Sequence, residues 1–434
     1  MTTFQARWGD VLEVARPSVH GRITGVVGLS MSAEGLLAAI GDVVTVQTAG
    51  QPILAEVVAV HRSGFACMPL GEVMGLRAGA LVTSTGGPMT VAVGESLLGR
   101  VLDGLGRPMD DGKPLTNVEH VLVDANPPHP LRRDRIEQQL CLGVRAFDTL
   151  MPCGRGQRLG IFAGSGVGKS SLLSMIARGT DAEMSVIALI GERGREVREF
   201  IENDLGPEGL ARSVVIVATS DEPPLVRLRA AFVATRIAEW FRDRGSNVVL
   251  MMDSLTRFAM AQREIGLSVG EPPATRGYPP SVFALLPRLL ERAGASEHGS
   301  ITGLYTVLVE GDDMNEPVGD TVRSILDGHV VLSRRLATSG HFPSIDVLES
   351  VSRVVNSITT PDQRADATKL RQLLAAYRDA RDLIEIGAYA HGSNPTVDMA
   401  IELLPRIDAY LRQDIAAVTP AAESWSWLHD LVAG

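Results

Sequence analysis

The chain has 434 residues, of which 45% are hydrophobic and 21% are charged, and its formal net charge is −10. This length predicts two or three domains with ample core, and this composition is typical of soluble globular proteins. The acidic total and an aromatic content of 4% argue against nucleic acid as the main partner, and three cysteines without C-x-x-C spacing favour a reduced, cytosolic protein over a zinc site.

The N-terminal segment, residues 1–20, has no apolar core that would indicate a signal peptide, and no window of the chain reaches the length of a membrane span. Phe4, Trp8, Val11 and Leu12 follow helical spacing and predict a short amphipathic helix. Two interpretations stay open: the helix caps the next domain, or it docks onto a partner.

Residues 21–90 predict a small β-barrel. Short β-prone runs separated by Gly, Pro and Asp turns indicate its strands, at 35–39, 43–48, 53–61 and 80–85. The glycines between residues 93 and 108 predict turns that lead out of the barrel. Prolines then predict an extended connector over 126–133, and the basic run Arg132–Arg135 is typical of a solvated connector.

Residues 91–358 predict an α/β domain. Apolar strands are expected at 158–163, 185–190, 213–219, 247–252, 301–309 and 329–333. Helices are expected at 170–178, 195–203, 223–243, 254–264 and 280–292. Such strands, separated by helices, indicate a mostly parallel sheet covered on both faces. Residues 359–434 predict a third, all-α domain, with helices at 367–385 and 398–411.

The strongest motif follows the first strand of this domain and consists of Gly164, Ser165, Gly166, Val167, Gly168, Lys169 and Ser170. Its glycines let successive backbone N–H groups point into one concavity, and the following helix adds its N-terminal dipole. Lys169 can reach the β- and γ-phosphates of a nucleotide, and the Ser170 hydroxyl can bind Mg²⁺. The motif predicts nucleotide binding, although Ala163 stands where the usual pattern has its first glycine. The alternative is a glycine-rich turn that ends in Lys-Ser.

Two carboxylates end apolar strands of the same domain. Asp253 follows the run 248–252 and is the kind of residue that holds magnesium in phosphate-loop enzymes, although it can also cap the next helix. Glu192 stands at the end of another strand and can polarise an attacking water. It is better placed for this role than Glu196, because it lies nearer to the end of the strand. Arg193 is placed to touch a γ-phosphate. An ordinary charged turn is the alternative for this pair.

A dense acidic stretch, residues 311–317, follows the predicted strand 301–309. It lacks the spacing of a calcium-binding loop. Subunit contacts or turn chemistry are therefore favoured there over a metal site.

With these motifs in place, the chain resembles the export ATPases of type III secretion systems, which are relatives of the catalytic subunit of rotary ATP synthases. The resemblance covers nearly the whole chain. Its most specific segments are 98–108, 162–170, 191–196, 253–257, 310–317 and 324–329. The loop sequence Gly-Ser-Gly-Val at 164–167 is similar to the flagellar branch of that family.

The resemblance implies a homohexameric ring that hydrolyses MgATP, with a barrel, a RecA-like core and a C-terminal helical domain. Residues implied to bind nucleotide are Gly164, Ser165, Gly166, Val167, Gly168, Lys169, Ser170, Ser171 and Phe342, the last as an aromatic residue on adenine. Ser170 and Asp253 are implied to bind magnesium. Residues implied in catalysis are the carboxylate Glu192, Lys169, Arg193 and Arg257 near the γ-phosphate, and Arg353, a finger supplied by the neighbouring subunit.

The resemblance also implies a role and partners. ATP hydrolysis would energise protein export by releasing export substrates from their chaperones, by unfolding these substrates and by assisting the membrane export gate. Further partners would be a regulator or stator protein and a central stalk protein. The protein would then work in the cytoplasm, at the inner face of the inner membrane.

Four other functions share part of this pattern. A virulence secretion ATPase differs little from a flagellar one. A rotary ATP synthase subunit should carry an acidic loop in its C-terminal domain, and residues 390–395 are not acidic. A hexameric RNA helicase should have an aromatic, basic first domain, and residues 21–87 contain one Phe. An inactive ring protein is disfavoured because Lys169, Glu192, Asp253 and Arg353 are all present.

Overall fold

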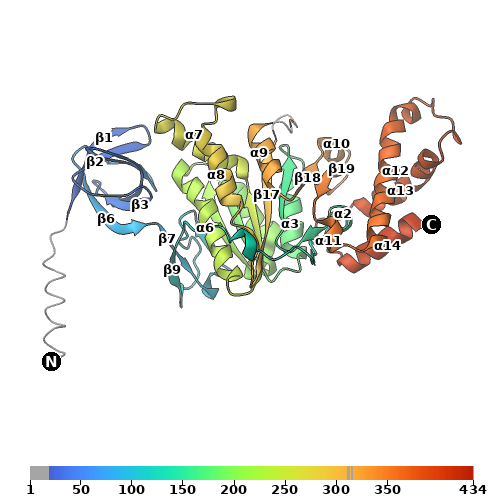
Figure 1. Ribbon diagram of the computed structural model, residues 1–434, viewed down its shortest axis with the longest axis horizontal. Coiled ribbons are helices and arrows are strands. Elements are labelled where there is room, and N and C mark those ends of the chain that lie inside the picture. Colours follow the sequence, from blue (N-terminus) through green and yellow to red (C-terminus); the bar gives the residue numbers. More distant parts are fainter. Residues whose placement is uncertain (1–18, 310–312, 314–315, 434) are drawn as a thin grey trace. The chain divides into compact units, whose positions relative to one another are not determined.

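The computed structural model describes residues 19–309, 313 and 316–433 (Figure 1). The amphipathic helix predicted around Phe4 to Leu12 lies outside these residues. The chain forms two compact units, of which the first ends at Met89 and also contains Ser268–Gly270, and the second holds the rest. Among the described residues, no helix is long and apolar enough to cross a membrane.

Six strands close into the barrel that the sequence predicts, in the spatial order β1-β2-β5-β4-β3-β6. They are β1 (Gly21–Val27), β2 (Ser30–Glu34), β3 (Asp42–Val46), β4 (Ile53–His61), β5 (Gly64–Pro69) and β6 (Leu81–Pro88). Ile23, Met31, Val44 and Phe65 belong to a buried core inside it. The strand predicted at 35–39 is wrong, because Gly35 takes a left-handed φ of +83° and the extended run ends at Glu34.

The segment that follows the barrel contains more structure than its glycines predict. Strand β7 (Thr90–Val93) pairs with β9 (Glu119–Leu122), and a 3₁₀ turn, η1, covers Glu95–Leu97. The turns predicted over 93–108 are partly wrong, because β8 (Val101–Asp103) pairs in parallel with a strand of the central sheet. Only three residues form β8, so its pattern is too short to stand out.

The second unit is built on a nine-stranded sheet with the order β19-β18-β12-β17-β15-β13-β14-β8, to which β16 is added at β17. Its strands are β12 (Arg158–Ala163), β13 (Met184–Glu192), β14 (Ser213–Thr219), β15 (Asn247–Asp253), β16 (Gly294–Ala295), β17 (Ser300–Leu308), β18 (Gly328–Leu332) and β19 (Ile345–Ser352). The main strands are parallel, as predicted, except that β19 runs antiparallel to β18 at the edge.

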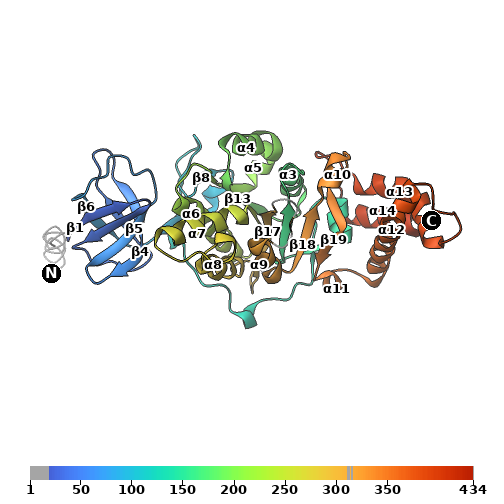
Figure 2. The same cartoon turned by 90° about the horizontal axis from the view of Figure 1, so that it is seen from above.

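Helices cover both faces of this sheet, and in Figure 2 α3 and α4 lie on one side with α8 and α9 on the other. The α-helices are α2 (Arg145–Leu150), α3 (Lys169–Gly179), α4 (Gly194–Glu199), α5 (Gly206–Ala211), α6 (Pro224–Arg242), α7 (Leu255–Ser268), α8 (Pro280–Leu290), α9 (Pro317–Ile325), α10 (Arg334–Thr338) and α11 (Val355–Ile358). Smaller elements are η2 (Pro130–Arg132), β10 (Gln139–Leu140), β11 (Cys153–Gly154), η3 (Phe200–Leu205) and η4 (Thr275–Gly277). The single helix predicted at 195–203 is α4 followed by η3, a π-helical turn.

Three C-terminal helices complete the unit: α12 (Pro361–Glu385), α13 (Pro395–Leu411) and α14 (Ala421–Ala433). Helix α12 begins earlier than predicted because Thr360 and Gln363 form a capping box around Pro361. Leu370 and Leu428 belong to the same buried cluster as Leu173 of α3. These helices therefore share a hydrophobic core with the α/β domain.

A buried ion pair holds α6 to the end of α8. Arg292 donates to Glu239 through Nε and Nη2, both at 2.7 Å, and each side chain is 1% exposed. Arg292 Nη1 also donates to the carbonyl of Val123 at 3.0 Å, which ties the segment after β9 to the same point. A buried charge of this kind is tolerated only while its partners remain.

We expect Glu239→Gln to lower the free energy of unfolding by about 3–5 kcal/mol, because it leaves the Arg292 charge uncompensated inside the protein. The urea midpoint of the full chain measures the change. Exposed Glu208→Gln is the matched control and should shift the midpoint little. An equal midpoint for Glu239→Gln and the wild type would contradict this role.

Candidate active site

The predicted phosphate loop lies at the carboxyl end of β12 and leads directly into α3. Gly166 and Gly168 take φ values of +75° and +91°, which favour glycine over residues with a side chain. Ala163 is the last residue of β12 and pairs with Leu308 and Leu332 in extended ladders. The alanine therefore stands where the backbone is extended, and this departure from the usual pattern is accommodated.

Lys169 meets two carboxylates at the same edge of the sheet. Its Nζ contacts Oδ1 of Asp253 and lies 3.4 Å from Oε1 of Glu192. Thr306 Oγ1 donates to the same Asp253 oxygen at 2.8 Å. Lys169 is the first residue of α3, after the loop that follows β12, whereas Asp253 and Glu192 are the last residues of β15 and β13. The carboxyl ends of these parallel strands thus bring the three side chains together, where the sequence predicts a ligand.

The electrostatics of this cluster differ between its members. Burial alone would lower the pKa of Lys169, but the charges of Asp253 and Glu192 outweigh it and the pKa is raised. Burial raises the pKa of Glu192 to about 7, although Lys169 opposes the shift. Lys169 is thus a fixed positive charge in a partly dry site, where it stabilises anionic groups more strongly than in water.

The donor set fits a magnesium nucleotide. Ser170 and Ser171 lie in the first turn of α3, next to the glycine cradle, and Asp253 ends strand β15, which β17 separates from β12. Among the described residues, no group of three or more His, Cys, Asp or Glu side chains is placed to hold a metal by itself. Mg²⁺ commonly binds through one or two protein groups together with phosphate oxygens, so Ser170 and Asp253 suffice.

The two predicted arginines near the phosphate lie differently. The Arg193 side chain is 81% exposed and pairs with Glu196 at 3.2 Å. Arg257 lies in the first turn of α7 and packs its stem against Gly191, where a Cβ would come within 2.8 Å of it. In the described structure its buried Nε makes no hydrogen bond. Glycine at 191 is therefore required for Arg257 to approach, a constraint that the sequence motif did not reveal.

A cavity of about 320 Å³ lies beside the loop and contains Phe342, whose ring packs near Gly168. Phe342 is 45% exposed, which suits a ring that stacks on a nucleotide base. The far wall comes from the linker between α13 and α14, namely Gln413, Asp414 and Ile415. These three residues were missed from the sequence, because nothing in the local pattern connects them with a loop so far away in the chain.

Gln413 fixes this wall in place. Its backbone N–H donates to the carbonyl of Phe342 at 2.9 Å, and its side-chain Nε2 donates to the carbonyl of Gly143 at 2.7 Å. The backbone N–H of Arg145 donates to its Oε1 at 2.9 Å. The C-terminal helices are thereby linked to the candidate base pocket.

Arg353 does not join the cluster around Lys169. It follows β19, whose last residue Ser352 pairs with Gly328 at the start of β18. Lys169, in contrast, follows the end of β12, which runs parallel to β18. Lys169 therefore lies beyond the carboxyl ends of the parallel strands, and Arg353 lies at their amino ends.

The acidic stretch at 311–317 is described only in part. Asp313 pairs with Arg276 at 3.1 Å, and Glu316 accepts from the backbone N–H groups of Val318 and Gly319 as the N-cap of α9. These contacts agree with turn chemistry for the two described acidic residues.

Comparisons with known proteins address the whole chain. Residues 143–352 match the model of the ATP synthase alpha/beta family, nucleotide-binding domain, and residues 359–430 match the T3SS EscN ATPase C-terminal domain. The flagellum-specific ATP synthase of Bacillus subtilis is 53% identical over 91% of each chain. The type 3 secretion system ATPase of Xanthomonas euvesicatoria is 51% identical over 91% of this chain and 90% of its own.

The chain belongs to the ATP synthase alpha/beta family, in the group of flagellar and type III secretion ATPases. The assembled ATPase EscN from the enteropathogenic E. coli type III secretion system has the same fold, with a TM-score of 0.90 and 45% identity over 95% of this chain and all of that one. The predicted family, the fold class and the ATPase activity are confirmed, and the nucleotide-binding domain of this family binds ATP.

We expect Glu192→Gln to keep ATP binding and to lower turnover by about 10²–10⁴-fold, because it removes the group placed to act on water. Equilibrium nucleotide binding and steady-state hydrolysis on the same preparation measure the two effects. Glu199→Gln, an exposed change of the same charge on the neighbouring helix, is the control. Near-normal turnover of Glu192→Gln would exclude Glu192 from catalysis.

Proposed function

We propose that this ATPase energises protein export through a flagellar type III system and that it works as a homohexamer. The glycine-serine-glycine-valine loop at 164–167 supports the flagellar branch, as do flagellar relatives with 50–53% identity. Virulence secretion is the second candidate, since such relatives reach 51% identity.

The chemistry follows from the positions of this chain's residues. Lys169 and the backbone N–H groups from Gly164 to Gly168 bind the phosphates, and Phe342 packs on the base. Glu192 orients and polarises the water that attacks the γ-phosphorus in line. Ser170 and Asp253 would hold magnesium, which would supply positive charge against the phosphates. Arg257, and Arg193 after a change of rotamer, stabilise the transferred phosphoryl group.

One observation supports the proposal that two copies complete each site: Arg353 and Lys169 lie at opposite ends of the strands of one sheet. The six residues of β12 span the distance between these two ends, and a strand rises about 3.3 Å per residue. The Arg353 side chain is shorter than that distance and is exposed at its own edge. A neighbouring copy is therefore the source from which such an arginine can reach a phosphate at Lys169.

The partners of this protein can be inferred from those of a related ATPase. EscN has been solved in complex with its central stalk EscO, at a TM-score of 0.89 to this chain. We infer that this protein also binds a central stalk, a regulator, export substrates with their chaperones and the export gate. It would then lie in the cytoplasm against the inner membrane.

Complementation of a deletion strain tests the export role. We expect the wild-type protein to restore secretion of flagellar subunits and Lys169→Ala to fail to restore it. Restored virulence secretion without flagellar secretion would favour the second candidate.

We expect Arg353→Ala and Lys169→Ala to be nearly inactive alone, because an arginine finger contributes about 10³-fold or more to turnover. Mixing the two proteins and letting them reassemble should restore part of the hydrolysis. Some interfaces then combine the intact loop of an Arg353→Ala copy with the intact arginine of a Lys169→Ala copy. Activity that stays at the level of the single variants, in mixtures shown to reassemble and bind nucleotide, would contradict a trans role.

A further inference from the structure

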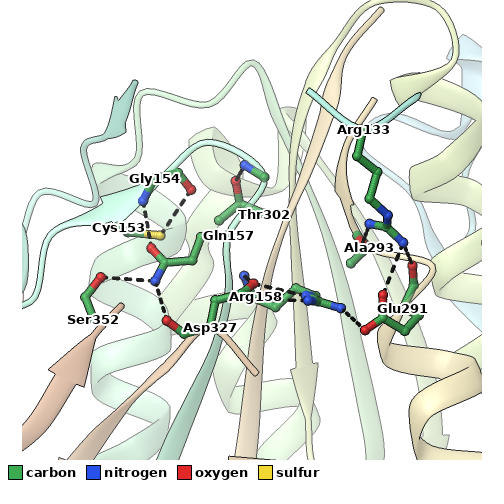
Figure 3. Close-up of polar contacts among 11 residues, drawn as sticks. Arg133, Cys153, Gly154, Gln157, Arg158, Glu291, Ala293, Thr302, Asp327 and Ser352 are labelled. Atoms are coloured by element: carbon green, nitrogen blue, oxygen red, sulfur yellow. Dashed lines mark hydrogen bonds and ion pairs between the residues drawn. The ribbon is translucent and has the colours of Figure 1, made fainter. Parts of the chain in front are cut away.

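A polar cluster lies at the end of the sheet opposite the phosphate loop, with Gln157 buried and Arg158, Asp327 and Ser352 half-buried (Figure 3). This cluster holds the backbone at Arg353. Asp327, just before β18, is its centre. The Asp327 carbonyl accepts from the backbone N–H of Arg353 and from Nε2 of Gln157, both at 3.0 Å. The same Gln157 nitrogen donates to Oγ of Ser352 at 3.0 Å, and that hydroxyl donates to the carbonyl of Pro152 at 2.8 Å.

Arg158 locks Asp327 from the other side. The Asp327 carboxylate accepts from the backbone N–H, Nε and Nη2 of Arg158 at 3.1, 3.0 and 3.2 Å, and the Asp327 N–H donates to the Arg158 carbonyl at 2.9 Å. Every polar group of Asp327 is therefore used. A bidentate arginine–carboxylate contact of this kind fixes both distance and orientation.

The side chain of Arg353, unlike its backbone, is held only weakly. It is exposed, and its guanidinium makes a long contact, 3.5 Å from Nη2 to the carbonyl of Arg323. A rigid backbone with an exposed guanidinium suits a residue presented to another molecule. Figure 3 also shows that Arg158 has a second carboxylate partner, Glu291, which lies on the side of Arg133 and away from β19.

Arg133 itself corrects one expectation from the sequence. The basic run at 132–135 predicts a solvated connector, and Arg132, Asp134 and Arg135 are exposed as expected, but Arg133 is half-buried and its Nη1 donates to the carbonyl of Ala293 at 2.9 Å. Its pairing with Glu291 at 3.3 Å brings the connector against the start of β12. Glu291 thus contacts the connector, whereas Asp327 holds the backbone at Arg353, where β19 ends beside the start of β18.

We propose that Asp327, Arg158, Gln157 and Ser352 are positioning residues that hold Arg353 for the active site of the neighbouring copy. The inference rests on the proposed trans role of Arg353 and assigns a cause to its geometry. Misplacement by about 1 Å can cost on the order of 10²-fold in rate, so small shifts of this backbone are sufficient to slow hydrolysis. None of the four residues touches the nucleotide site of its own copy.

Asp327→Asn is the main test. The amide cannot accept all three Arg158 contacts, so Asp327 holds the Arg353 backbone less firmly. We expect kcat of the assembled full-length protein to fall about 10–100-fold, with KM for ATP within about threefold of the wild type. Ser352→Ala, which removes two hydrogen bonds beside Arg353, should lower kcat in the same direction and guards against misfolding of Asp327→Asn. Glu291→Gln removes the other partner of Arg158 and should leave kcat within about twofold.

Mixed assemblies distinguish a positioning role from general damage. Asp327→Asn mixed with Lys169→Ala should regain activity, because the second protein supplies a well-held Arg353. Asp327→Asn mixed with Arg353→Ala should regain none, because neither copy offers a working arginine. Recovery in this second mixture, or wild-type kcat in both Asp327→Asn and Ser352→Ala, would overturn the proposal.

The proposed trans role fails separately from this inference. If Arg353→Ala mixed with Lys169→Ala shows no recovery, Arg353 does not act between copies, and the positioning role falls with it. If that mixture recovers while Asp327→Asn mixed with Lys169→Ala does not, only the positioning role of Asp327 is overturned.

Discussion

The shared direction of β12, β17, β15 and β13 is the constraint on which the site depends. Because these strands are parallel, residues that follow them emerge at one edge, and Lys169, Glu192 and Asp253 meet there from distant parts of the chain. Strand β19 reverses this direction. It begins near the base pocket at Phe342 and ends at Ser352, just before Arg353, so one strand connects the copy's own nucleotide site with the end of the sheet where we propose that Arg353 meets a neighbour.

Local patterns predicted most of the scaffold. The strands at 158–163 and 213–219 match the structure residue for residue, since each is an apolar run between clear turn signals. The same approach failed where a glycine changed the backbone direction, as at Gly35, and where an element was as short as β8. The motif around Lys169 likewise predicted a glycine-rich loop, in which Gly166 and Gly168 take left-handed φ values.

Contacts between residues that are distant in the chain could not be predicted from the sequence. Gln413 reaches Phe342 and Gly143 through hydrogen bonds, and Asp327 joins Arg158 to the backbone of Arg353. In each case the residues are ordinary polar ones, and only the fold brings them together. Arg133 shows the converse, because one arginine of a charged run that is otherwise exposed donates to the carbonyl of Ala293. The roles given to individual site residues remain predictions that the proposed experiments test.

The most direct measurement is a structure of the assembled protein with magnesium, ADP and a planar fluoroaluminate in place of the transferred phosphoryl group. We expect the guanidinium of Arg353 from one copy within hydrogen-bond distance, about 2.7–3.2 Å, of a fluoride bound at Lys169 of the next copy. An Arg353 that stays outside the neighbour's site, or a phosphoryl mimic contacted only by residues of its own copy, would contradict a site completed by two subunits.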